Sequence, residues 1–421
     1  MSNIIKHIGT IIWNQRKNNA WLWAELFLVS ICLWYIIDFI GPVWRIMRMP
    51  TGFDTSNTYR ITLGCKTPGS DGYVDLSDQE NATGESLLTL MERVRQNPVI
   101  ESVSVSVSSQ PYLSTMNEHT DFLYNQDTMG VQAQRYWVTA SFFDVFKVHS
   151  PGSTPDELKE KLTPNSIIIS PETADRLMPG KNPLGNYLKV NMDGNLLRIN
   201  AVTIPIRRTE YVRPYPSFFI LMSEQDMLNI ITPGNIHDIE FCVRVKPEAG
   251  KNFRDYFFAE LTPNLSIDNI FVIDVISTSA YRERVIGYEK GLVTVRGILF
   301  VFLLVNIFFG ISGTFWLRTR QRRGEIGLRM ALGSSKANVR NILFIEGLIL
   351  LVLAFLPAAF ISMNIMVSDL VEKYWMDISW IRYVIGIMVT FLILVVIVAS
   401  GIWYPAHYTM KMQPSEALRS E

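Results

Sequence analysis

The stretch that decides the fold is Leu317–Gly333, LRTRQRRGEIGLRMALG, a short basic segment between two apolar runs. Leu292–Trp316 precedes it, and Asn341–Ser368 follows with Glu346 as its one acidic or basic residue. Each run exceeds the roughly 20 residues that a helix needs to cross about 30 Å of hydrocarbon. Because arginine-rich loops stay on the cytoplasmic side of a membrane, the segment is predicted to face the cytoplasm.

The composition of the chain is ordinary, but its distribution is not. The 421 residues are 48% hydrophobic with a net charge of zero, typical of a globular protein. The apolar residues concentrate at the two ends, while the middle, Arg45 to Lys290, has the composition of a soluble domain large enough to bury a core. The balanced charge gives no reason to expect nucleic acid as a partner.

Four segments are predicted to cross the membrane: Trp21–Val43, Leu292–Trp316, Asn341–Val367 and Arg382–Tyr404. The first is predicted to be a retained anchor, because it is long and no small-residue cleavage site follows it. The expected fold is therefore a membrane α-helical protein with a large extracytoplasmic α+β domain inserted between helices 1 and 2.

Charged residues in the flanks predict the orientation. Residues 1–20 contain three basic residues and no acid, the connector 368–381 is net acidic, and the loop between the second and third spans is strongly basic. The basic residues of that loop are Arg318, Arg320, Arg322, Arg323, Arg329, Lys336 and Arg340. Both termini and this loop are thus expected in the cytoplasm, and the large domain on the other side of the membrane.

The periodicity of the sequence divides the chain further. Isoleucines in residues 1–20 form one face of a cytoplasmic amphipathic helix that could lie on lipid. The external domain, 44–290, opens and closes with a strand–helix–strand pattern, which predicts one split β-α-β subdomain, 52–110 and 236–290, around a strand-rich insertion, 111–235. The predicted elements are Thr58–Gly64, Thr83–Asn97 and Ile100–Val107, then Asp238–Val245, Gly250–Leu261 and Asn269–Ile276. The complete predicted order is 1–20, span 21–43, domain 44–290, span 292–316, loop 317–340, span 341–367, periplasmic loop 368–381, span 382–404 and cytoplasmic tail 405–421. Ser277–Lys290 is expected to run without a break into the second span.

Motifs for catalysis are missing from the sequence. There is no G-x-x-x-x-G-K-[ST] phosphate loop, no HExxH and no nucleophile elbow, and the five histidines lack metal-ligand spacing. We therefore expect a non-catalytic chain with no metal and no cofactor of its own. Cys65 and Cys242 could form a disulfide outside the cell, although unpaired core cysteines are the more common alternative.

Three acids fall inside the predicted spans. Glu25 and Asp38 lie toward opposite ends of the first span, and we expect their side chains to reach the membrane surface rather than to act inside it. Glu346 has two equally weighted interpretations, a surface-reaching acid or an interhelical contact that braces the loop. Gly310 and Gly313 permit close helix approach and give weak support to a dimer face.

The basic segment has a helical pattern of its own. Glu325 and Arg329 are spaced for an i, i+4 pair, and Ile326 lies on an apolar ridge beside them. Gly333 is a suitable residue after a helix end, and Ser334 or Ser335 can cap the next helix. Charge and spacing alone leave a docking helix and an ordinary basic loop as even alternatives.

The stretch QRRGEIGLRMALGSSKANVRNILFIEG, residues 321–347, resembles the cytoplasmic loop and following span of MacB/FtsX-type ABC transporter permeases. The tail YPAHYTMKMQPSEALRSE, 404–421, is similar to the ending of that family, and SFFDVF, 141–146, is a weaker likeness in the external domain. Met330 departs from a usual arginine, Tyr408 from a usual small residue, and the acidic first span from a Gly-rich one.

The resemblance implies a permease subunit in a bacterial inner membrane, with a MacB-like periplasmic core domain. ATP would be bound by a separate cytoplasmic ABC ATPase subunit, and a second permease subunit, identical or paralogous, would complete a dimer; a periplasmic protein and membrane lipid are further candidate partners. The implied coupling helix that docks the ATPase comprises Arg322, Arg323, Glu325, Ile326, Gly327, Arg329, Ala331, Leu332 and Gly333, with Glu346 as the intramembrane acid. ATP hydrolysis would then drive export or extraction of a substrate through mechanical work in the periplasm. The alternative is a membrane sensor or regulator whose external domain binds a ligand or controls a cell-wall enzyme without transport.

Overall fold

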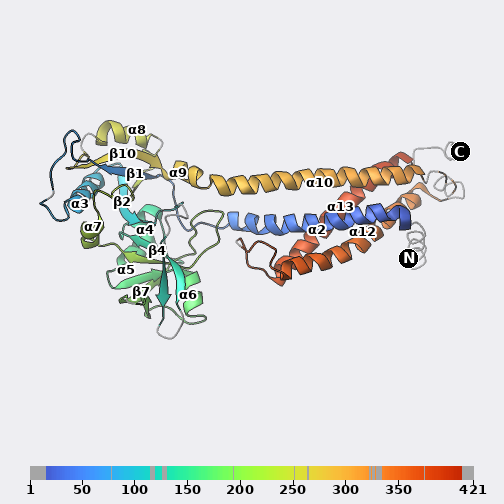
Figure 1. The fold of residues 1–421 in the computed structure, drawn as a ribbon, viewed down its shortest axis with the longest axis horizontal. Coiled ribbons are helices and arrows are strands. Elements are labelled where there is room, and N and C mark those ends of the chain that lie inside the picture. The colour runs from blue at the N-terminus through green and yellow to red at the C-terminus, as the bar shows by residue number, and fades with distance from the viewer. Residues whose placement is uncertain are drawn as a thin grey trace. The chain divides into compact units, whose positions relative to one another are not determined.

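The structure is a computed structural model, which describes residues 16–76, 78–113, 119–125, 130–192, 194–250, 252–262, 265–321, 324, 328, 334–373 and 375–409. The chain divides into two compact units (Figure 1). One unit combines the two ends of the chain, Met1–Met47 and Glu289–Glu421, and the other is Arg48–Tyr288.

The first unit contains four helices that are long and apolar enough to cross a membrane. They are α2 (Arg16–Met47), α10 (Gly287–Gln321), α12 (Lys336–Val367) and α13 (Trp380–Thr409). Helices α2, α12 and α13 pack against one another around a core that includes Leu26, Leu350 and Leu394. Backbone hydrogen bonds inside each helix satisfy the polar groups that a bilayer cannot. The predicted membrane α-helical fold with an inserted α+β domain is confirmed.

The helices are longer than the predicted spans. Helix α2 is helical from Arg16, the first described residue, so it already precedes the predicted span at Trp21. Helix α10 continues beyond Trp316 to Gln321, and α13 continues through Pro405 to Thr409. The predicted spans therefore mark the apolar part of each helix rather than its ends. Of the predicted amphipathic helix 1–20, residues 1–15 lie outside the described residues.

Helix α10 has little cover along its length. Ile311 and Phe315 contribute to the core of the first unit. Ile298, Phe302 and Phe309 are each more than 60% exposed. Such a continuous apolar surface is suited to lipid or to another membrane protein, not to water.

The second unit contains both predicted β-α-β patterns, and their strands alternate in one sheet. Strands β10, β1, β9 and β2 follow one another in that order, with antiparallel pairing throughout. The first pattern is β1 (Thr58–Cys65), α3 (Ala82–Arg95) and β2 (Ile100–Val107). The second is β9 (Glu240–Val245), the helical turns α8 (Phe253–Tyr256) and η2 (Phe257–Leu261), and β10 (Ile270–Ser277).

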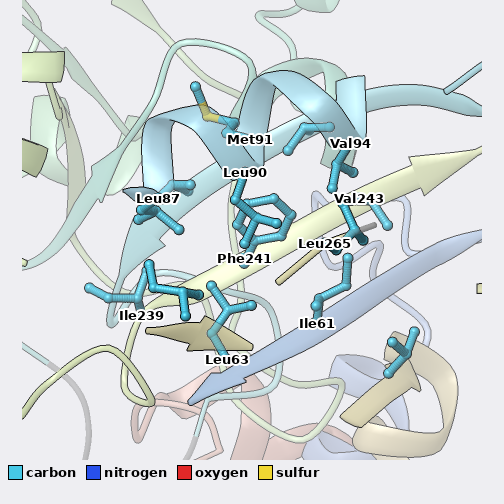
Figure 2. Close-up of a cluster of buried hydrophobic side chains, with 14 of the residues drawn as sticks. Ile61, Leu63, Leu87, Leu90, Met91, Val94, Ile239, Phe241, Val243 and Leu265 are labelled. Atoms are coloured by element: carbon cyan, nitrogen blue, oxygen red, sulfur yellow. The ribbon is translucent and has the colours of Figure 1, made fainter. Parts of the chain in front are cut away.

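The hydrophobic core of this sheet lies under α3, as Figure 2 shows. Side chains alternate across a strand, so Ile61 and Leu63 of β1 point to the same face as Phe241 and Val243 of β9. The apolar side of α3 closes over them with Leu87, Leu90, Met91 and Val94. This burial explains why the two halves of the pattern, separated by more than a hundred residues in the chain, form one subdomain.

The middle of the chain forms a closed β-barrel, which the sequence did not predict beyond its richness in strands. The strand pairs run in a circle from β4 through β3, β6, β7, β5 and β8 back to β4. These strands are β3 (Thr120–Tyr124), β4 (Val131–Val138), β5 (Ser166–Ile169), β6 (Tyr187–Val190), β7 (Leu196–Val202) and β8 (Ser217–Leu221). Closure removes the exposed strand edges of a flat sheet.

Short helices cover the barrel and join it to the split sheet. Leu177 of α6 (Pro171–Leu177) packs with Leu123, Ile167 and Ile199 of the barrel strands. A second core contains α4 (Phe142–Phe146) and α5 (Pro155–Lys161) together with barrel residues and Cys242 of the split sheet. Helix α7 (Glu224–Ile230) packs on α3 and begins with a capping box between Ser223 and Asp226.

The cysteines are unpaired, which supports the alternative of core cysteines over a disulfide. All three cysteines are free. Cys242 of β9 lies opposite Arg60 of β1. Cys65 is also in β1, but five residues beyond Arg60 and opposite Ile270 of β10. At about 3.3 Å per residue this register separates their Cα atoms far beyond the roughly 7 Å that a disulfide permits.

The expected unbroken helix from Ser277 to Lys290 is wrong. The structure has α9 (Thr278–Val285), a turn at Ile286, and then α10 from Gly287. Gly287 has high conformational entropy in the unfolded chain and favours a helix boundary over a helix interior. The Ser277 hydroxyl caps α9 by accepting from the Ala280 N–H.

A buried carboxyl in the split sheet makes the stability of this unit depend on pH. Glu240 is 1% exposed, and its Oε2 accepts hydrogen bonds from Ser106 Oγ and from the Ser109 and Gln110 N–H groups. Burial raises the pKa of Glu240 above its usual 4.5, although these hydrogen bonds and Arg60 oppose the shift. The protonated form is therefore favoured more in the folded chain than in the unfolded chain.

We expect Glu240→Gln to flatten the pH dependence of stability. Because the pKa of Glu240 is raised in the folded chain, the protonated carboxyl adds to the free energy of unfolding of wild type below about pH 4.5. This added stability is lost as the pH rises through the folded-state pKa. The amide of the variant has no such proton to lose, so the free energy of unfolding of the variant relative to wild type should increase as the pH rises from about 4 to about 8. Denaturant titrations of both chains across this range measure the difference, and a constant difference would contradict the assignment.

Candidate functional site

The predicted docking helix lies outside the described residues, so the structure does not test it. This applies to every member of the predicted set, Arg322, Arg323, Glu325, Ile326, Gly327, Arg329, Ala331, Leu332 and Gly333. Its two flanks are described. Helix α10 carries the chain to Gln321, and α12 starts at Lys336, where Ser335 Oγ accepts from the Asn338 N–H at 3.2 Å. Ser335 is therefore one of the two predicted caps.

Glu346, the predicted intramembrane acid, is enclosed by helices. It lies in α12 and is 3% exposed. The next residue, Gly347, faces Phe315 of α10 and Ile402 of α13 so closely that a Cβ would collide with Ile402. This burial favours the interhelical interpretation over a side chain that reaches the membrane surface. Helix α12 thus carries the Glu346 carboxyl into the core of the first unit, about one turn after Asn341, the first residue of the predicted span.

The expectation that Asp38 reaches the membrane surface is wrong. Asp38 of α2 is 4% exposed and forms a two-pronged ion pair with Arg382 of α13. Arg382 Nε and Nη2 lie 2.9 and 2.5 Å from the two carboxylate oxygens. The guanidinium also donates to the carbonyls of Met376, Glu372 and Asp38 itself. A buried charge needs such a complete set of partners, and this set ties α2, α13 and the connector between α12 and α13 together.

A second ion pair joins α10 to the same connector. Arg296 Nη1 lies 2.8 Å from Glu372 Oε2, and the Arg296 guanidinium stacks 3.9 Å from the centre of the Phe39 ring. Apolar cavities of about 340 and 600 Å³ flank the Asp38–Arg382 pair, and each includes both residues in its lining. The charged network therefore sits in an otherwise apolar region of the first unit.

Glu25 points at a neighbouring helix, which corrects the second surface-reaching expectation. Its Oε1 lies against Gly310 of α10, where a side chain would collide with it. Gly310 thus accommodates an acid of the same chain, which removes it as support for a dimer face. Gly313, in contrast, has open space beside it.

Sequence reasoning missed Arg382 as a partner of Asp38 and Arg296 as a partner of Glu372. The only signal was that Arg382 is a basic residue at the start of an apolar run, which is also the usual place for a side chain that reaches the interface. The part of the chain that the structure describes contains no cluster of His, Cys, Asp or Glu residues suited to a metal ion.

Each of the two units contains a region that matches a known family model. Residues 47–252 match the model of the MacB-like periplasmic core domain, and residues 297–414 match that of the FtsX-like permease C-terminal region. The first match covers the split sheet through β9 together with the barrel, and the second covers most of α10, all of α12 and α13, and the loop between α10 and α12.

The curated relatives that the chain resembles include two macrolide export proteins. The macrolide export ATP-binding/permease protein MacB of Neisseria gonorrhoeae is 24% identical over 301 residues, and that of Neisseria meningitidis is 23% identical. Each alignment covers 69% of this chain but only 44% of the relative, so the chain spans less than half of their length.

Two solved structures are also similar. The periplasmic region of MacB from Actinobacillus actinomycetemcomitans has 15% identity and a TM-score of 0.33, covering 56% of this chain and 95% of that one. A domain of a permease-type protein from Porphyromonas gingivalis has 12% identity and a TM-score of 0.35, covering 53% and 89%. The two family regions, in this order and over most of the sequence, show that the chain belongs to the MacB/FtsX-type ABC transporter permeases.

Proposed function

We propose that this chain is the permease subunit of an ABC-type complex, powered by an ATPase on another polypeptide. The observation that carries the proposal is the FtsX-like region 297–414, which contains the basic loop between two long apolar helices. The sequence has no phosphate-binding loop of its own. Residues 322–333 are then the surface through which ATP hydrolysis acts on the membrane helices, and the chain itself is non-catalytic.

The packing of the first unit suits such a role. A force applied to the loop would act on the start of α12, which is capped by Ser335. Helix α12 in turn packs against α2 and α13. Close contacts at Gly347 and Gly401 leave little room for one helix to slide independently of its neighbours. Movement at the loop would therefore shift several helices together, and the connections at Met47 and Gly287 would pass it to the external unit.

The proposed arrangement follows the charge distribution. The basic loop and both termini lie in the cytoplasm of a bacterial cell, and the MacB-like core domain lies in the periplasm. Two such subunits, identical or paralogous, form the working complex in the inner membrane. Work is done on a substrate in the periplasm by mechanical movement, as export or extraction.

Replacing Glu325 and Arg329 together by alanine should abolish copurification with the ATPase. The change removes a helical i, i+4 pair and two charges from the proposed docking helix while leaving the apolar spans intact. The matched control is Asp369→Ala with Lys373→Ala, an exposed i, i+4 pair with a 2.6 Å separation in the connector after α12. Both variants should insert into membranes as wild type does, and ATPase that stays bound to the first variant would refute the docking role.

A further inference from the structure

The loop between β7 and β8 contacts both chain segments that link the external unit to the membrane helices, one after α2 and one before α10. We call residues 204–213 the clamp loop, residues 49–55 the entry segment, and α9 the exit helix. The entry segment follows α2 in the chain, and the exit helix precedes α10. All three segments belong to the unit Arg48–Tyr288.

Arg207 holds the entry segment by its backbone. Arg207 is 1% exposed, and its guanidinium donates to the carbonyls of Met49 and, at 3.1 Å, of Pro50. The Arg207 N–H donates to the Thr51 carbonyl at 2.9 Å. The same guanidinium donates to the Glu210 and Val212 carbonyls of the clamp loop. One buried side chain thus fixes the shape of the loop and its grip on the entry segment.

Gly52 confirms how closely the two segments approach. Its φ of +86° is in the region that favours glycine, and a Cβ there would lie 2.6 Å from the Pro205 carbonyl oxygen. Any side chain at this position would push the entry segment away from the clamp loop.

Glu210 holds the exit helix by an ion pair. Arg282 Nε of α9 lies 2.5 Å from Glu210 Oε1, and the Tyr112 hydroxyl donates to the same oxygen at 3.1 Å. Burial and the Glu210 charge raise the pKa of Tyr112 to about 12, so the hydroxyl keeps its proton. The Arg282 guanidinium also lies 5.9 Å from the Tyr112 ring and 2.7 Å from Glu283.

The contacts of Arg207 and the Glu210–Arg282 ion pair differ in how easily they can be broken. Arg207 is buried and makes hydrogen bonds to five backbone carbonyls. Breaking them would remove hydrogen-bond partners from a buried charge, which is costly. Arg282 and Glu210 have side chains 32% and 20% exposed, so water can replace either partner. The start of the exit helix is fixed separately, since Thr58 Oγ1 of β1 donates to Thr278 Oγ1 at 2.8 Å. Its later turn, which carries Arg282, has the releasable contact.

We propose that the clamp loop is the coupling element of the external unit, with Arg207 as a fixed anchor to the entry segment and Glu210–Arg282 as a releasable latch on the exit helix. Because the clamp loop connects two barrel strands, movement of the exit helix away from the entry segment acts directly on the barrel. This role rests on the proposed function for its driving force, whereas the latch itself exists without an ATPase.

Hydrogen exchange of the full chain in lipid nanodiscs, without ATPase, tests the latch. Glu210→Gln should increase exchange of the amides in residues 281–286 by about three- to tenfold, as expected for loss of a partly exposed ion pair. Exchange in residues 49–52 should stay as in wild type. Arg207→Met should give the opposite pattern, with faster exchange at 49–52. The matched control is Glu283→Gln, which removes the more exposed carboxylate on Arg282 and should change neither region.

The reversed pair Glu210→Arg with Arg282→Glu should restore protection of the exit helix, which a general loss of folding would not. Equal increases in both regions, an unchanged exit helix in Glu210→Gln, or the same effect from Glu283→Gln would each overturn the latch. Adding the ATPase and ATP then tests the coupling. In wild type, turnover should increase exchange at 281–286, and the Glu210→Gln chain should show no further increase. If the latch behaves as expected without ATPase but exchange at 281–286 does not change on turnover, the coupling role of the clamp loop is refuted and the latch is not. The proposed function is tested separately, by copurification of the ATPase.

Discussion

Asp38→Asn should destabilise the membrane unit by about 3–5 kcal/mol, the range measured when one partner of a buried ion pair is removed. The substitution keeps the size of the side chain and removes its charge. Arg382, 6% exposed, would then keep its positive charge in an apolar region with carbonyl groups alone to balance it. We expect a corresponding loss in the free energy of unfolding of the full chain, measured by denaturant titration in mixed micelles.

Two further variants separate the ion pair from a general effect of mutation. Asp369→Asn removes the acid of an ion pair with Lys373 whose partners are more than half exposed, and it should cost no more than about 1 kcal/mol. Asp38→Leu with Arg382→Met removes both charges and should recover most of the lost stability, because no unpaired charge stays buried. Equal losses for Asp38→Asn and Asp369→Asn would show that Asp38 is solvated and would contradict the observed geometry.

The Asp38–Arg382 pair shows where sequence reasoning stopped. The four spans follow from hydropathy alone, because the bilayer imposes a length and an apolar composition on each helix. The pairing of Asp38 with a residue 344 positions away depends on how the helices pack, which no local pattern specifies. A charge near a span end has the same sequence signature whether it reaches the membrane surface or meets a partner in the bundle.

The external unit shows the same division between local and distant information. The alternation ESVSVSV in residues 101–107 and the apolar face of Ala82–Arg95 are local, so the β-α-β order could be predicted. Closure of the barrel could not, because it depends on the parallel pairing of β4 with β8, where Gln134 lies opposite Ser217. The clamp loop was missed for a related reason. Arg207 lies outside any helix or strand, and its partners are backbone carbonyls that have no sequence signature.

The sequence resemblance supplied what periodicity could not at the candidate site. Charge and spacing alone predict that residues 317–340 form a basic cytoplasmic loop, and they leave docking as one of two interpretations. The family match over 297–414 gives this loop its place in a permease region, while the role of each of its residues stays a prediction. Burial of Glu346 adds a structural observation that favours a contact between helices just beyond the loop.

Phe219→Ala should remove about 3–5 kcal/mol from the stability of the external unit, the usual cost of emptying a buried phenylalanine site. Phe219 of β8 is fully buried and stacks on Tyr136 of β4 with ring centres 4.6 Å apart. The Phe143 ring of α4 lies 5.4 Å from it on the same core. Phe219 therefore supports both the strand pair that closes the barrel and the helix that joins the barrel to the split sheet.

The matched control is Phe122→Ala, on strand β3 of the same barrel. Phe122 is 46% exposed, so its loss should change the free energy of unfolding by no more than about 0.5 kcal/mol. Phe219→Leu should fall between the two, because leucine fills part of the site without the ring contacts. Denaturant titrations of the three variants in the full chain measure the series. If Phe219→Ala were as mild as Phe122→Ala, the barrel would not depend on the β4–β8 seam, and a clamp loop attached to that barrel would have no rigid body to move.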